Sequence, residues 1–150
     1  SMKPIKEFML LAITAAKRAR DSNEVPVGAV IVKDNSVIGT GFNSVIQDHS
    51  VSSHAEIHAL NSASKTMQNY RLLNCDLYVT LEPCHMCAKA IVDARIRNVY
   101  FATLEPKNGS LVSQDNFFDK QHLNHRVNFS YGLMEEEASH LLKSFFKTRR

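Results

Sequence analysis

A strand–helix–strand pattern in the second half of the chain narrows the choice of fold. DLYVTL (76–81) and NVYFA (98–102) are short apolar runs rich in β-branched and aromatic residues, which is typical of buried strands. The segment between them, CHMCAKAIVDARI (84–96), has helical character and follows Pro83, a residue that helices tolerate at their start. Two strands joined through a helix are expected to lie parallel in one sheet, with a right-handed crossover.

The rest of the chain continues this alternation of helices and strands. Further helices are predicted over 6–21, 53–67 and 135–150, and further strands over 27–33, 37–42 and 126–132. Asp34 and Asn35 separate the first two of these strands and predict a β-hairpin, while Ser53 is the expected N-cap of the second helix. The order predicts an α/β fold of three layers, α/β/α, with a central mixed five-stranded sheet flanked by helices.

Composition is that of an ordinary globular protein. The 150 residues are expected to form one domain spanning 1–150, with Ser1 interpreted as a residue left by an expression vector, and 44% hydrophobic with 22% charged residues argue against disorder. Three cysteines do not suggest a secreted disulfide framework, and we see neither a secretory signal nor a membrane-length apolar run. We therefore expect a cytoplasmic protein without a membrane partner. A net charge of +3 is too small to predict nucleic-acid binding by itself.

Two predicted helix starts carry residues that bind metals. His54 begins the second helix, and Cys84 and Cys87 begin the third. The unpaired N–H groups at a helix start stabilise thiolates. Two thiolates and one imidazole give zinc a neutral set of ligands and leave one tetrahedral position for water, which is typical of catalytic zinc. The sequence therefore predicts one Zn²⁺ per chain, held by these three residues.

Glu56 is the candidate acid–base group. It lies two residues after His54, close to the predicted metal without having to be a ligand, so it could carry protons for a metal-bound water. Together, His54-Ala55-Glu56 and Pro83-Cys84-His85-Met86-Cys87 form the H-x-E…P-C-x-x-C pattern of zinc-dependent nucleobase deaminases.

The same motifs are compatible with other kinds of site. CxxC alone also occurs in redox proteins, and His58, one turn after His54, could complete a purely structural zinc site. HAEIH does not match the metalloprotease helix, because Ala55 stands where that motif needs glutamate. Cys75 is expected to be a small core residue, and His85 is expected to make local packing contacts.

Beyond the zinc motif, the chain resembles the bacterial tRNA-specific adenosine deaminases from about residue 5 to 150. The likeness rests on EVPVGAVIV, HAEIHAL, MQNYRL, LYVTLEPCHMC, NHRV and FFKTRR, which stand in the family's order. These enzymes are homodimers of the cytidine-deaminase-like fold that convert adenosine to inosine at the anticodon wobble position. The resemblance implies that fold, hydrolytic deamination with release of ammonia, a tRNA anticodon stem-loop as partner, a homodimer and no binding to DNA.

The resemblance also implies roles for single residues. His54, Cys84 and Cys87 match the family's zinc ligands, and Glu56 matches its proton shuttle. The positions expected to contact the substrate or the RNA are Asn43, Ala55, Glu105, Lys107, Asn124, Phe145, Lys147, Arg149 and Arg150. The aromatic and basic residues of the tail suit a single-stranded RNA loop, although the residues alone are equally typical of a solvated helix end.

Two segments depart from the family's pattern. Ser50-Val51-Ser52-Ser53 precedes the HAE motif where the family usually has an Asp-Pro-Thr type of lead, and Glu105-Pro106 replaces the usual aspartate before Lys107. Both lie on the expected RNA-facing side, so they bear on loop specificity and not on deamination. The residues leave two other functions open: a deaminase of free guanine, cytosine or cytidine, and a non-catalytic, zinc-stabilised RNA-binding module.

Overall fold

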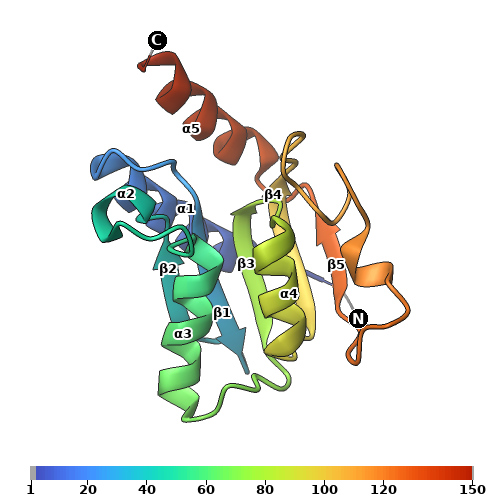
Figure 1. The fold of residues 1–150 in the computed structure, drawn as a ribbon. Helices are drawn as coiled ribbons and strands as arrows, with labels where there is room; N and C mark the ends of the chain where they lie inside the picture. Colours follow the sequence, from blue (N-terminus) through green and yellow to red (C-terminus); the bar gives the residue numbers. More distant parts are fainter. Residues whose placement is uncertain (1–2, 150) are drawn as a thin grey trace.

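A five-stranded sheet forms the centre of the computed structural model, which describes residues 3–149 (Figure 1). Its strands are β1 (Gly28–Lys33), β2 (Ser36–Phe42), β3 (Asp76–Leu81), β4 (Asn98–Thr103) and β5 (Asn128–Tyr131). The helices are α1 (Lys6–Asp21), α2 (Val45–Asp48), α3 (Ala55–Met67), α4 (His85–Asp93) and α5 (Glu135–Lys147), with a short 3-10 helix, η1 (Phe117–Asp119). This confirms the predicted α/β class and the number of strands.

The sheet is mixed, as predicted. Its strand order is β2-β1-β3-β4-β5, and β1 pairs antiparallel with both of its neighbours. β3, β4 and β5 are parallel, so the unit β3–α4–β4 is the parallel pair expected from the sequence. The carboxyl ends of β3 and β4 therefore meet at one end of the sheet, where loops carry functional groups in open α/β sheets.

The hairpin between β1 and β2 turns on two residues. Asp34 and Asn35 have φ angles of 51° and 62°, and Lys33 pairs with Ser36 across them. Two consecutive left-handed residues are the conformation of a type I′ turn, whose twist matches that of the flanking strands and which Asn and Asp tolerate. The predicted hairpin is thereby confirmed.

Helices cover both faces of the sheet. Figure 1 shows α3 and α4 side by side on one face, whereas α1 lies behind the sheet and α5 extends past the end where β3 and β4 finish. Successive residues of β1 point to opposite layers: Ala29 and Ile31 pack with α3 and α4, and Val30 and Val32 pack with α1. Because both faces are covered, the three central strands β1, β3 and β4 are buried along most of their length. Cys75 is fully buried in the first of these layers, as predicted.

Some predicted boundaries were wrong. The N-cap of α3 is His54 and not Ser53, because the carbonyl side chain of Asn43 binds the N–H of Ala55 in place of the Ser53 hydroxyl. The four-residue helix α2 was missed, and α5 ends at Lys147. Arg150 lies outside the described residues. None of the helices between residues 3 and 149 combines the length and apolar composition needed to cross a membrane.

Candidate metal centre and catalytic cleft

The predicted metal ligands meet where α3 and α4 begin. His54 is the N-cap of α3, Cys84 is the N-cap of α4, and Cys87 lies in the first turn of α4. Their ligand atoms all lie within 4.8 Å of one another. Nδ1 of His54 is 3.7 Å from Sγ of Cys84 and 3.5 Å from Sγ of Cys87. Residues separated by thirty positions in the sequence thus form one cluster.

The spacing of this cluster fits zinc. Bonds of about 2.05 Å to nitrogen and about 2.3 Å to sulfur, at a tetrahedral angle, place the two ligand atoms about 3.6 Å apart. The two observed nitrogen–sulfur distances, 3.7 and 3.5 Å, lie on either side of that value. Within residues 3–149, this is the one group of three His, Cys, Asp or Glu side chains with ligand spacing. The site is therefore a zinc site with His54, Cys84 and Cys87 as protein ligands.

His58 and His85 do not belong to this cluster. The Nε2 atom of His58 lies 2.8 Å from Oγ of Ser44 and 3.4 Å from a carboxylate oxygen of Asp48, which accounts for the side chain without a metal. His85 contacts the segment after β4 and not its sequence neighbours, with Nε2 3.0 Å from a carboxylate oxygen of Asp115 and its ring edge-on to Phe117. A structural site completed by His58 is thereby not supported.

The pKa values of the two thiols shift in opposite directions in the metal-free chain. The hydrogen bond from Cys87, supported by His54, lowers the pKa of the Cys84 thiol to about 4 even though burial opposes ionisation. The same hydrogen bond, together with burial, raises the pKa of Cys87, and the bond to Cys84 raises that of His54. A thiolate at a helix start is therefore already present to attract a cation, and binding of zinc would displace the remaining thiol proton.

Glu56 is buried beside the ligands. It lies in the first turn of α3 and is 4% exposed. Burial raises the pKa of its carboxyl group to about 7 in the metal-free chain. A carboxyl group that titrates near neutral pH can both accept and release a proton under working conditions, which is the property that a general acid–base needs.

The metal cluster opens into a cleft of about 1630 Å³. His54, Glu56 and Cys84 line it together with segments that follow β2 and β4 and with one side of α5. Of the predicted substrate and RNA contacts, those that line the cleft are Asn43, Glu105, Lys107, Phe145, Lys147 and Arg149. Ala55 is fully buried behind Asn43, whereas Asn124 is exposed and does not line the cleft.

The tail lines the cleft differently from what the sequence suggests. Phe145 is only 6% exposed, and the guanidinium of Arg149 lies 3.6 Å from the centre of its ring. Arg149 also donates a hydrogen bond of 2.8 Å to the side-chain carbonyl of Asn23, in the turn after α1. Phe146 is 51% exposed and is the aromatic side chain that this part of α5 presents to solvent.

Two buried carboxylates in the cleft walls were missed in the sequence. Glu24 accepts backbone hydrogen bonds from Ile46 (3.1 Å) and Gln47 (2.8 Å) at the start of α2, and Glu82 binds the loop that follows β4. Both are 2–3% exposed. The only signal was a charged residue beside an apolar run, because most of their partners are backbone N–H groups, which any sequence possesses.

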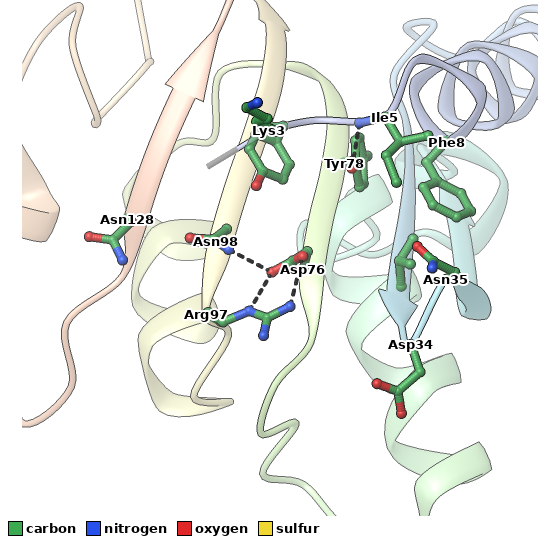
Figure 2. A pocket seen from close by; sticks show the side chains of 12 residues that line it. Lys3, Ile5, Phe8, Asp34, Asn35, Asp76, Tyr78, Arg97, Asn98 and Asn128 are labelled. Atoms are coloured by element: carbon green, nitrogen blue, oxygen red, sulfur yellow. Dashed lines mark hydrogen bonds and ion pairs between the residues drawn. The ribbon is translucent and has the colours of Figure 1, made fainter. Parts of the chain in front are cut away.

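A second, smaller cavity of about 430 Å³ lies at the opposite end of β3 and β4 (Figure 2). Its centre is occupied by an ion pair in which both side-chain oxygens of Asp76 accept hydrogen bonds of 3.1 Å from Arg97. Asn98 donates a third, of 3.0 Å, to the same carboxylate. Asp76, Arg97 and Asn98 thus bind one another, and among the residues that the structure describes this cavity contains no cluster of metal ligands like that at the other end of the sheet.

The fold and the metal site together define the class of protein. Residues 2–103 match the family described as the cytidine and deoxycytidylate deaminase zinc-binding region. A guanine deaminase from Nitrosomonas europaea shares the fold with a TM-score of 0.81 at 20% identity, over 96% of this chain and 85% of that chain. The protein is a zinc-binding member of the cytidine-deaminase-like class.

More similar relatives narrow the class. The chain is 44% identical to the tRNA-specific adenosine deaminase of Haemophilus influenzae, over 97% of this chain and 84% of the relative, and 46% identical to that of Aquifex aeolicus, over 95% and 94%. A structure from studies of A-to-I editing by tRNA:A34 deaminases at the wobble position has a TM-score of 0.89 at 40% identity, over 92% of this chain and 100% of that chain. The chain belongs to the tRNA-specific adenosine deaminase family.

Proposed function

We propose that the protein converts adenosine to inosine at the wobble position of tRNA anticodons, with consumption of water and release of ammonia. The observation that supports this best is the position of Glu56, buried beside three zinc ligands in a large cleft. Membership of the tRNA-specific adenosine deaminase family supplies the choice of adenosine in tRNA.

The proposed chemistry assigns the proton transfers to Glu56. When bound, zinc supplies Lewis acidity that makes a water molecule a nucleophile near neutral pH. Glu56 takes a proton from that water and delivers it to N1 of adenine as C6 is attacked. Glu56 then takes the proton of the new hydroxyl group on C6 and passes it to the departing amino group, so that ammonia leaves and the base becomes hypoxanthine. Because Glu56 is buried, this proton is exchanged with the substrate and not with bulk solvent.

The dimensions of the cleft support an RNA substrate over a free nucleoside. Pockets for small molecules usually enclose about 300–1000 Å³, and this cleft of about 1630 Å³ is larger. Lys107, Lys147 and Arg149 place cations along it, and Phe146 offers an exposed ring for stacking. Cations for phosphates and aromatic rings for splayed bases are what a single-stranded anticodon loop requires.

The remaining parts of the proposal come from the family resemblance. We propose a cytoplasmic homodimer in which each chain is a single domain over residues 1–150 and binds the anticodon stem-loop of tRNA. Asn43, Ala55, Glu105, Lys107, Asn124 and the residues from Phe145 to Arg150 stay as the proposed contacts of substrate or RNA. Neither DNA nor a membrane is part of the proposed function.

Incubation of the purified protein with an anticodon stem-loop bearing a wobble adenosine tests the proposal. Free cytidine, guanine and adenosine are supplied in parallel, and a stem-loop with the adenosine moved one position away from the wobble site serves as control. We expect inosine in the first RNA alone, with ammonia in equal amount, and no product from the Glu56→Ala variant. Ammonia from a free base would identify a small-molecule deaminase, and tight RNA binding without product would identify a binding module.

A further inference from the structure

Glu82 binds one loop of the cleft with both of its carboxylate oxygens. Oε1 accepts hydrogen bonds from the N–H of Glu105 (3.0 Å) and from the hydroxyl of Ser113. Oε2 accepts three from consecutive backbone N–H groups, those of Leu111 (3.1 Å), Val112 (2.8 Å) and Ser113 (2.9 Å). All five donors belong to residues 104–114, called the cleft loop below, which follows β4.

These hydrogen bonds compensate a buried charge. Glu82 is 3% exposed, and none of the ion pairs among residues 3–149 includes it. A buried carboxylate without a cation needs its oxygens fully hydrogen-bonded, since an unpaired buried charge is strongly unfavourable. Successive N–H groups in one loop form an anion-binding concavity that meets this need. The conformation of the cleft loop and the burial of Glu82 therefore depend on each other.

Gly109 shows how closely the loop encloses this carboxylate. A Cβ atom at position 109 would lie 2.2 Å from the carboxylate carbon of Glu82, nearer than non-bonded atoms can approach. A side chain at position 109 would collide with this carboxylate, so only glycine fits. Ser110 also ties the loop to the residue after Glu82, because its N–H (2.9 Å) and its hydroxyl (3.2 Å) both donate to the carbonyl of Pro83.

The same loop carries two of the residues proposed to meet RNA. Glu105 and Lys107 both line the cleft. The carboxylate of Glu105 closes the turn by accepting hydrogen bonds of 3.0 Å from the N–H of Lys107 and from the side chain of Asn108. The N–H of Glu105 is itself held by Glu82, so the turn that presents Lys107 is built on the buried carboxylate.

We infer that Glu82 is a positioning residue for RNA recognition, one that fixes the cleft loop so that Lys107 and the Glu105 turn stand at a set distance from the zinc site. Glu82 follows β3 and is two residues before Cys84, so it joins the loop to the segment that provides a metal ligand. The inference rests on the proposed function in one respect only, namely that the ligand aligned by the loop is RNA.

Amide hydrogen exchange and steady-state kinetics of three variants test the inference. Glu82→Gln keeps the size of the side chain but turns an NH₂ group toward two or three hydrogen-bond donors, and Ser113→Ala removes one donor and leaves the backbone intact. Ile13→Ala, in the buried face of α1, is the control for lost stability without contact with the loop. For each variant we would measure zinc content, thermal stability, and KM and kcat separately with the stem-loop as substrate.

We expect the amides of residues 105 and 111–113 to exchange about tenfold faster or more in Glu82→Gln. A hydrogen bond to a charged acceptor contributes more than about 1.4 kcal/mol, and 1.4 kcal/mol corresponds to a factor of ten in an equilibrium constant. The KM for the stem-loop should rise roughly tenfold with a smaller change in kcat, and zinc should stay at one per chain. Ser113→Ala should show the same changes to a lesser extent, whereas Ile13→Ala should lower thermal stability and leave KM unchanged.

Three results would overturn the inference: unchanged exchange of the loop amides in Glu82→Gln, loss of zinc in that variant, or an equal rise of KM in Ile13→Ala. If the wild-type protein makes no inosine in the stem-loop, the proposed function fails instead. Hydrogen exchange and the affinity for the RNA, measured by titration, then still decide whether Glu82 aligns the loop for RNA binding.

Discussion

The side-chain carbonyl of Asn43, at the end of β2, accepts a hydrogen bond of 2.8 Å from the N–H of Ala55, the first residue of α3. This contact caps the helix whose N-cap residue is the zinc ligand His54. Because the side-chain oxygen of Asn43 already accepts this hydrogen bond, its NH₂ group is the part that can donate to a base in the cleft. One side chain thus caps the helix that begins at the metal ligand, and we propose that it also offers a donor to the substrate.

Substitutions at Asn43 should separate these two roles. Asn43→Asp keeps an oxygen for the Ala55 N–H but loses the NH₂ donor, so we expect near wild-type thermal stability and a loss of activity of at least tenfold. Asn43→Ala loses both groups and should in addition lower the free energy of unfolding by about 1 kcal/mol, the usual cost of a lost helix cap. Thermal unfolding with kinetics on the stem-loop checks both. Equal activity of Asn43→Asp and wild type would exclude the donor role.

The three cysteines should differ sharply in their effect on zinc. Cys84→Ala removes a thiolate of the cluster, and we expect the metal content of the purified protein to fall well below one per chain. Cys75→Ala removes a buried thiol that faces the core beside β3, so it should cost about 1 kcal/mol of stability and leave zinc at one per chain. Metal analysis after dialysis distinguishes them. Loss of zinc from Cys75→Ala would mean that the ligand set is wrong.

Glu56→Gln should slow turnover strongly without releasing the metal. General acid–base groups contribute about 10²–10⁴-fold to rates, and an amide of the same shape cannot carry the proton. We expect a fall of kcat in that range, with the affinity for the stem-loop and the zinc content unchanged. A variant that lost zinc would show that Glu56 is a ligand, and one that kept its activity would assign the proton transfers elsewhere.

The raised pKa of Glu56 predicts a pH-dependent stability of the metal-free chain. Its ordinary pKa of 4.5 becomes about 7 on folding, so between these values the folded form binds more protons than the unfolded form. The contribution of this group to the free energy of unfolding therefore falls as the pH rises through that window, by up to about 3 kcal/mol. In Glu56→Gln the side chain does not titrate, so the free energy of unfolding does not lose this contribution as the pH rises. Urea unfolding of both metal-free proteins at about pH 5 and about pH 8 measures their free energies of unfolding. The variant should be more stable than the wild type only at the higher pH.

Local patterns were sufficient to predict most of the fold. The apolar spacing of 6–21 predicts the bounds of α1, Lys6–Asp21, because an amphipathic helix carries its period in its own sequence. Asp34 and Asn35 mark the hairpin for the same reason: their preference for left-handed angles is a property of the residues themselves. In contrast, α2 is four residues long, too short to show any period.

The metal ligands were predictable, but the scaffold that holds the cleft was not. His54, Cys84 and Cys87 have a chemistry that few residue types share, so their spacing identifies them. Glu82 and Asn43 act through backbone N–H groups more than ten positions away, and no side-chain pattern identifies which N–H they will meet. Such contacts follow from the packed arrangement of the elements. The resemblance likewise did not indicate that Phe145 is buried and Phe146 exposed, because both fall in the same motif.

The exposed end of α5 provides the last test, of the RNA interface. Truncation after Ser144 would also delete Phe145, which is buried, so single substitutions are the cleaner choice. Phe146→Ala should weaken binding of the stem-loop roughly 5- to 150-fold, as expected for about 1–3 kcal/mol from one stacked base. Lys147→Ala should reduce the slope of log affinity against log salt by about one, because one fewer phosphate contact releases counterions.

His140→Ala is the matched control for both, since this residue is exposed on the same helix but does not line the cleft. Its stem-loop affinity should equal that of the wild type at every salt concentration. If all three variants bound RNA equally well, the tail would be a solvated helix end, and the contacts to the anticodon loop would have to come from the cleft loop and from the segment after β2.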